Sequence, residues 1–176
     1  GSFRVLLKGY VVTGAALAIK KRALKKIGAV PHVNKELIND GWIALNLSMS
    51  NQIGFINSCL IQYREHSNQQ VGFKSKPAHV SLLQRFTRSR EEKLCTLRKK
   101  ADIAHALLKH FEEEEEINPA IKTALLRREA FYRMRANLSA SRMLRFLPVI
   151  KHAMQGSYQM EEGGKWWRPL LGDLFE

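Results

Sequence analysis

Residues 39–49 read NDGWIALNLSM, and this pattern predicts an amphipathic helix. Trp42, Leu45 and Met49 follow one another at spacings of three and four residues, so they share one helical face. Asp40 stands near the start of the helix, where a carboxylate caps free backbone N–H groups. The plain interpretation is therefore a capped helix with an ordinary core tryptophan. The functional alternative is a general base at a helix start, since the next residue has no side chain and leaves room for a substrate.

Small and β-branched residues precede this helix. Residues 11–19 surround Thr13-Gly14-Ala15-Ala16 and predict a turn leading into a strand, because Gly14 permits close approach of the backbone. A basic helix over residues 21–27 is expected next. This part of the chain therefore predicts a strand followed by a helix.

Two short β-rich runs follow the central helix, at residues 53–56 and 60–63, and they predict consecutive strands. Tyr63-Arg64-Glu65-His66 closes the second run and opens a polar loop that ends at Gly72. An arginine fork suits phosphate, and a histidine can bind a metal or donate to a diphosphate oxygen. A polar surface loop after an edge strand is the alternative interpretation.

The rest of the chain has helical periodicity. Helices are expected over residues 81–110, 119–137 and 139–154, and residues 156–176 are expected to form an irregular tail. The domain organisation predicted is thus residues 1–76 as an α/β part, 77–155 as a helical extension and 156–176 as a tail.

The composition is that of a folded domain with a polyanionic partner. Hydrophobic residues make up 45% and charged residues 26%, which excludes a solvated tail, and the net charge is +13. Such a charge favours nucleic acid, an anionic lipid surface or a phosphorylated substrate. The later helices carry a set of basic side chains that suits an anionic membrane, or simply the cationic outer face of a helical bundle. These are Lys122, Arg127, Arg128, Arg133, Arg135, Arg142, Arg145 and Lys151.

The cysteine content indicates a reducing compartment, and the hydropathy indicates no membrane span. Cys59 and Cys95 have no second pair, which argues against a disulfide framework and a zinc site and favours a reducing environment. The longest weakly polar run, residues 10–19, is about half of the ~20 residues that a membrane span needs. No transmembrane helix and no signal peptide are expected.

Taken in order, these segments resemble the second half of the family 2 glycosyltransferases. The resemblance covers residues 10–72 and rests on the Thr-Gly-Ala-Ala, Asp-Gly-Trp and Tyr-Arg-x-His motifs. It implies an α/β fold, the carboxyl-terminal part of a GT-A nucleotide-diphospho-sugar transferase, followed by an α-helical extension. The residue roles that it implies are Asp40 as the catalytic base, Gly14, Gly41 and Trp42 on the acceptor side, and Tyr63, Arg64 and His66 at the donor diphosphate.

The resemblance also implies an activity and its cofactor. The activity is inverting transfer of a sugar from a nucleoside diphosphate sugar to a saccharide or lipid-linked acceptor, in polysaccharide synthesis in the cytoplasm or on the inner face of the plasma membrane. A divalent metal, Mg²⁺ or Mn²⁺, is implied, with His66 as one ligand.

Three departures limit the resemblance. Asn39 stands where many members have His, and Gln69 where many have Asn. No Asp-x-Asp metal motif occurs in the chain, so these residues are expected to be an inactive part of a longer enzyme. A rival interpretation, a basic helical module that binds nucleic acid or a membrane surface without catalysis, explains the charge but not the order of motifs.

Overall fold

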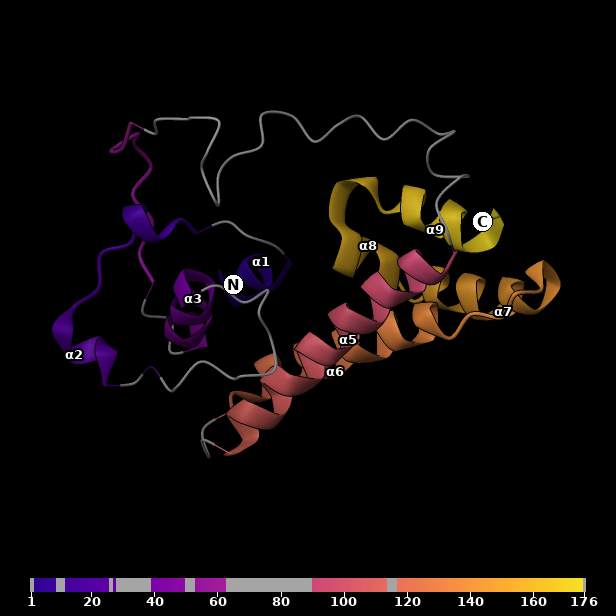
Figure 1. Cartoon of the computed structure of the whole chain (residues 1–176), viewed down its shortest axis with the longest axis horizontal. Coiled ribbons are helices and arrows are strands. Elements are labelled where there is room, and N and C mark those ends of the chain that lie inside the picture. Colours follow the sequence, from indigo (N-terminus) through magenta and orange to yellow (C-terminus); the bar gives the residue numbers. More distant parts are fainter. Residues whose placement is uncertain are drawn as a thin grey trace.

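The computed structural model describes residues 2–8, 12–25, 27, 39–49, 53–62, 90–113 and 117–175. Within these ranges every regular element is a helix (Figure 1). The elements are α1 (Ser2–Lys8), η1 (Gly14–Ala16), α2 (Lys21–Leu24), α3 (Asn39–Met49), α5 (Arg90–Glu113), α6 (Pro119–Ala136), α7 (Arg142–Met154), α8 (Ser157–Glu162), η2 (Gly163–Lys165) and α9 (Trp167–Phe175).

The predicted α/β fold, the carboxyl-terminal part of a GT-A sheet, is wrong for these residues. Thr13 and Leu17 have extended backbones, but the residues between them form the single 3₁₀ turn η1. Residues 53–62 contain no strand, and Phe55 is 88% exposed. β-rich composition reflects fit to a pleated, half-buried surface, so it does not by itself make a strand where no neighbouring ladder forms.

Most of the helices predicted from the sequence are present in the structure. The helices expected over residues 39–49, 119–137 and 139–154 are confirmed as α3, α6 and α7, and the described part of the helix expected over 81–110 is α5. The tail expected to be irregular instead folds into α8, η2 and α9. Two of its glycines mark turns between these helices: Gly156 and Gly163 adopt φ of 70° and 73°, a region that glycine enters without strain.

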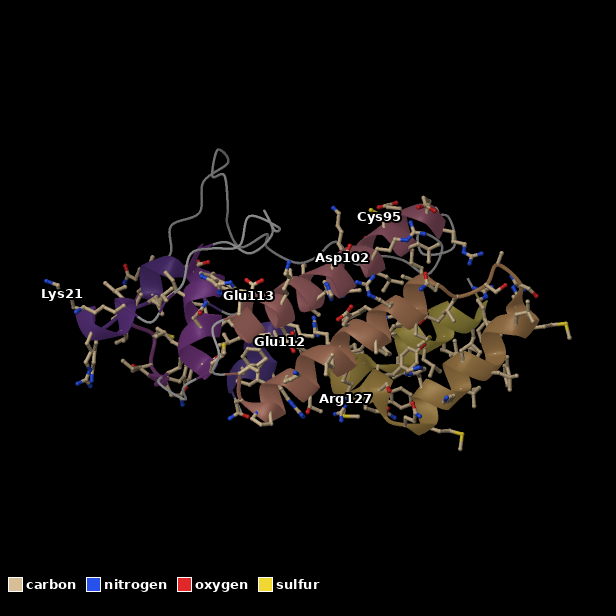
Figure 2. All side chains as sticks on the ribbon, turned by 90° about the horizontal axis from the view of Figure 1, so that it is seen from below. Lys21, Cys95, Asp102, Glu112, Glu113 and Arg127 are labelled. Atoms are coloured by element: carbon tan, nitrogen blue, oxygen red, sulfur yellow. The ribbon has the colours of Figure 1, made fainter. Side chains whose placement is uncertain are left out.

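Helices α5 and α6 form a hairpin against which the other helices pack, and the two helices run side by side in Figure 1. Asn118 caps α6, its Oδ1 accepting from the Ala120 N–H at 2.9 Å, and Pro119 takes the first helical turn, where no N–H is needed. Ala101 and Ala104 of α5 are fully buried, since small side chains let the two helices approach closely. Charged side chains such as Asp102 and Arg127 cover the outside (Figure 2).

One hydrophobic core lies at the end of the hairpin where α5 passes into α6. There α1 and α3 supply Phe3, Trp42 and Leu45, which pack against Phe111, Leu125 and their neighbours on the hairpin. The rings of Trp42 and Phe111 stack with centroids 5.8 Å apart and an interplanar angle of 3°. This core holds α3, and with it Asp40, against the long helices.

A second core lies at the other end of the hairpin. It joins Leu97 and Phe131 of α5 and α6 to Val149 of α7 and Tyr158 of α8. Each hairpin helix is therefore shared by both cores. No helix in the described ranges has the length and apolar character needed to cross a membrane.

Candidate functional site

Asp40 joins two motifs that lie 26 positions apart in the sequence. Its Oδ2 accepts a hydrogen bond from the Gly14 backbone N–H at 2.8 Å, and its Oδ1 accepts from the Gly41 N–H at 2.8 Å. The first bond ties η1 to the start of α3. The Thr-Gly-Ala-Ala and Asp-Gly-Trp segments, which are separate motifs in the sequence, thus meet at one carboxylate.

The rest of α3 orients this carboxylate. Trp42 is fully buried and Leu45 is 4% exposed, so the inner face of α3 is anchored in the core while Asp40, at the start of the helix, stays partly exposed. Asp40 lies in the first turn, where the helix dipole favours negative charge. The carboxylate is therefore held at the surface in one orientation by its helix and by Gly14.

Gly14 lies directly beside the carboxylate. Gly14 is exposed, and a Cβ added to it would lie 3.5 Å from both Cβ and Oδ2 of Asp40. That distance is an ordinary contact, so a side chain there would cover the carboxylate without clashing with it. Each carboxylate oxygen has a second lone pair, and both remain able to accept a proton or a hydrogen bond from a bound hydroxyl.

The acceptor-side residues predicted from the sequence occupy two different environments. Gly14 and Gly41 flank the carboxylate, each donating its backbone N–H to it. Trp42 lies in the core, so in this structure it supports the helix that carries Asp40 and presents no surface to a ligand. The donor-side residues Tyr63, Arg64 and His66 lie outside the described residues.

The described residues offer no donor set for the implied divalent metal. Across them, no three His, Cys, Asp or Glu side chains are grouped so that they could hold an ion. His66, the ligand expected from the resemblance, is not among them. This part of the chain alone therefore does not fit the metal that the resemblance implies.

No protein-family model, curated protein or solved structure matches the chain. Its function must therefore be inferred from the geometry of its own residues.

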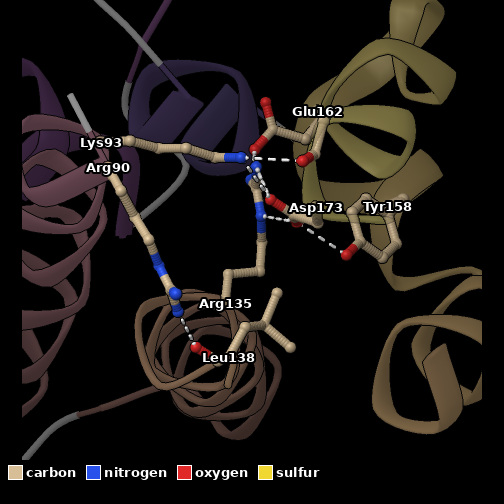
Figure 3. Close-up of polar contacts among 8 residues, drawn as sticks. Arg90, Lys93, Arg135, Leu138, Tyr158, Glu162 and Asp173 are labelled. Carbon is tan, nitrogen blue, oxygen red and sulfur yellow. Dashed lines mark hydrogen bonds and ion pairs between the residues drawn. The ribbon is translucent and has the colours of Figure 1, made fainter. Parts of the chain in front are cut away.

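A second polar cluster, which the sequence did not reveal, lies at the far end of the hairpin (Figure 3). Asp173 of α9 is 1% exposed and accepts from Arg135 Nε and, at 2.8 Å, from the Tyr158 hydroxyl. Arg135 also pairs with Glu162, and Lys93 Nζ lies 3.3 Å from Asp173 Oδ1. Burial together with the charge of Asp173 raises the pKa of Tyr158.

Three of the eight basic residues that the sequence suggested for a cationic outer or membrane-facing surface do not lie on any surface. Arg128, Arg135 and Arg145 are buried, at 6%, 5% and 5% exposure. Arg128 pairs with Glu161 at 2.8 Å, while Arg135 meets Asp173 and Glu162. The carboxylates belong to residues 156–176, which were expected to be irregular. No local sequence pattern therefore predicted these ion pairs. Because each charge in the Arg135 group is matched by an opposite charge or a hydroxyl, the cluster is a structural clamp.

A shallow cavity near α7 holds a histidine and a serine. His152 Nδ1 lies 3.3 Å from Ser157 Oγ, and burial, with help from Lys151, lowers the pKa of His152. A nucleophilic serine needs a histidine that is itself oriented by a third group, in most cases a carboxylate. No carboxylate contacts His152 within the described residues, so nothing in the geometry of the pair supports a catalytic role.

Proposed function

We propose that this chain contributes the catalytic base of an inverting glycosyltransferase that uses a nucleoside diphosphate sugar, as the family 2 enzymes do, and that Asp40 is that base. The acceptor is a hydroxyl of a saccharide or a lipid-linked glycan. The proposal rests on the geometry around Asp40 and not on a sheet, since every regular element among the described residues is a helix.

One observation carries the proposal. The 2.8 Å hydrogen bond from the Gly14 N–H to Asp40 Oδ2 brings together the two motifs that the resemblance places on the acceptor side. A helix N-cap alone would be satisfied by donors of its own helix, such as the Gly41 N–H. The additional bond to a distant, exposed glycine supports a carboxylate positioned for an incoming group.

The chemistry follows from a fixed carboxylate. Asp40 removes the proton of the acceptor hydroxyl as its oxygen attacks the anomeric carbon of the donor. The bond from that carbon to the diphosphate oxygen breaks at the same time, and its electron pair leaves with the nucleoside diphosphate. Attack from the side opposite the leaving group inverts the anomeric configuration. The two backbone N–H groups fix the orientation of the base, so little reorganisation is needed.

The proposal places the nucleotide-binding part of the enzyme outside these 176 residues, because no Asp-x-Asp motif occurs among them. The test therefore uses the protein extended by its upstream coding sequence, assayed with a panel of nucleoside diphosphate sugars with and without Mg²⁺ or Mn²⁺. Asp40→Asn removes the base with almost no change of shape. We expect it to lower kcat by at least about a hundredfold while donor binding stays nearly unchanged.

Gly14→Ala tests whether the Asp40 carboxylate acts on a bound acceptor or only caps its helix. Its methyl group would stand 3.5 Å from the carboxylate while the backbone N–H remains, so we expect a raised KM for the acceptor and an unchanged affinity for the donor. Substantial transfer by Asp40→Asn would remove Asp40 from the role of base. If the extended protein uses none of the nucleoside diphosphate sugars, the transferase proposal is wrong.

A further inference from the structure

The outward face of α7 is apolar. Met143, Leu147 and Met154 are 87%, 76% and 85% exposed, and together with Ile150 they follow spacings of three and four residues along one stripe. Leu144 and Phe146, on either side of the stripe, are 69% and 55% exposed. Figure 2 shows that some of the side chains of this helix project away from the rest of the molecule.

The inward face of the same helix is no more apolar than the outward one. It buries Val149 completely, but it also buries Arg145, and His152 lies partly buried on the same side. A surface helix ordinarily turns its apolar stripe to the core and its polar side to water. Because α7 instead leaves a row of apolar side chains in water, its outer face is a candidate surface for contact with another apolar medium.

Helix α9 packs beside α7 and adds exposed aromatic rings. Trp167 and Phe175 are 47% and 55% exposed, and the Arg168 guanidinium lies over the Trp167 ring, 5.3 Å from its centroid. Tryptophan with a neighbouring cation is typical of residues that sit between an apolar layer and water.

The charged groups that remain exposed on this part of the chain have one sign. From residue 142 to 175 the exposed charged side chains are Arg142, Lys151 and Lys165. The acids of the same stretch are turned inward, because Glu161 and Glu162 pair with Arg128 and Arg135 and Asp173 is buried. Arg142 and Lys151 belong to α7 itself, so within these residues the exposed charges next to its apolar stripe are cations.

We propose that α7, with α9 beside it, binds the surface of an anionic lipid bilayer, with the apolar stripe of α7 inserted at the level of the headgroups. Charge complementarity selects this partner, since lipid phosphates neutralise Arg142 and Lys151 on the same helix. A second copy docked on the same face would bring those cations together. This binding is independent of the sugar transfer proposed above.

The test is flotation of the full chain with vesicles of phosphatidylcholine alone and of phosphatidylcholine mixed with phosphatidylglycerol. We expect binding to the anionic vesicles at least about tenfold stronger than to the neutral ones, and weakened by salt. The triple variant Met143→Ser, Leu147→Ser and Met154→Ser should lose at least about tenfold of that binding. Its circular dichroism should match that of the unaltered protein, because all three side chains are exposed.

Matched controls lie elsewhere on the surface. Phe55→Ser, Ile56→Ser and Leu60→Ser remove similarly exposed apolar side chains outside α7 and should leave vesicle binding unchanged. Lys151→Glu should weaken vesicle binding several-fold. Lys109→Glu, at an exposed position of α5, should weaken it much less.

Two results would overturn the proposal. One is failure of the unaltered chain to bind anionic vesicles, or equal binding by the α7 triple variant. The other is a dimer in gel filtration that the triple variant abolishes without any vesicle binding by the unaltered chain, which would assign the face to contact between copies.

Discussion

At the scale of single residues, two aspartates show how burial separates a structural role from a chemical one. Asp40 is partly exposed and accepts from two backbone N–H groups, so its carboxylate remains available to an incoming hydroxyl. Asp173 is 1% exposed and is surrounded by Arg135, Tyr158 and Lys93. A carboxylate enclosed in this way balances the charge of Arg135 and has no path to a substrate.

Replacing Asp173 tests the clamp. Asp173→Asn removes the negative charge and leaves the Arg135 guanidinium buried with only Glu162 opposite it. We expect the free energy of unfolding to fall by about 3–5 kcal/mol in urea denaturation, the usual result of breaking a buried ion pair on one side. The matched control is Asp102→Asn, whose side chain is 59% exposed and lies 3.5 Å from Arg133. That change should alter stability by less than about 1 kcal/mol, and equal effects would contradict the clamp.

At the scale of elements, the α5–α6 hairpin is held by polar contacts on its outside as well as by its cores. Glu129 of α6 accepts from Arg133 on its own helix at 2.8 Å and lies 3.1 Å from His105 of α5. Burial would raise the pKa of Glu129, but its hydrogen bonds with Arg133 and His105 outweigh burial and lower the pKa below its usual 4.5. The contact between the two helices therefore depends on an ionised glutamate.

This pKa shift predicts a pH dependence of stability. Because the pKa of Glu129 is lower in the folded chain than in the unfolded chain, its contribution is complete above about pH 4.5 and is lost as the pH falls through the folded value. Urea midpoints measured between pH 7 and pH 3 should fall less steeply for Glu129→Gln than for the unaltered chain. Glu91→Gln is the control, since Glu91 is 74% exposed and its partner Arg98 is 52% exposed. Identical acid sensitivity of Glu129→Gln and the unaltered chain would contradict the assignment.

At the scale of the whole molecule, two cores share one pair of helices. The first core holds α1 and α3, and the second holds α7, α8 and α9 (Figure 1). Since α5 and α6 contribute to both cores, we expect a destabilising change at one end to affect the other end as well. The candidate base on α3 and the apolar face of α7 are thus attached to opposite ends of the same two helices.

A cavity at one end tests this coupling. Leu125 of α6 is fully buried in the first core, and Leu125→Ala should lower the free energy of unfolding by about 2–5 kcal/mol. If the molecule unfolds as one unit, the most protected amides of α8 and α3 should lose hydrogen-exchange protection by similar factors. Loss confined to α3 would show instead that the two cores open separately.

Local patterns predicted the central helices of this protein but not α8 and α9. Side-chain periodicity and the Asn118-Pro119 start are properties of neighbouring residues, so α3, α6 and α7 could be predicted with boundaries close to those observed. The strands expected within residues 11–19, 53–56 and 60–63 could not be predicted reliably in the same way. A strand exists only when another strand pairs with it, and β-rich composition carries no information about that partner.

Only the tertiary structure decided which polar residues act together. Asp40 and Gly14 both belong to motifs visible in the sequence, but their hydrogen bond spans 26 positions and depends on how α3 packs against the hairpin. Arg135 was expected to face outward, and its burial is decided by carboxylates 27 and 38 positions later in the chain. Periodicity shows which side chains share a helical face, whereas the partner of that face is set by long-range packing, which short-range sequence signals do not encode.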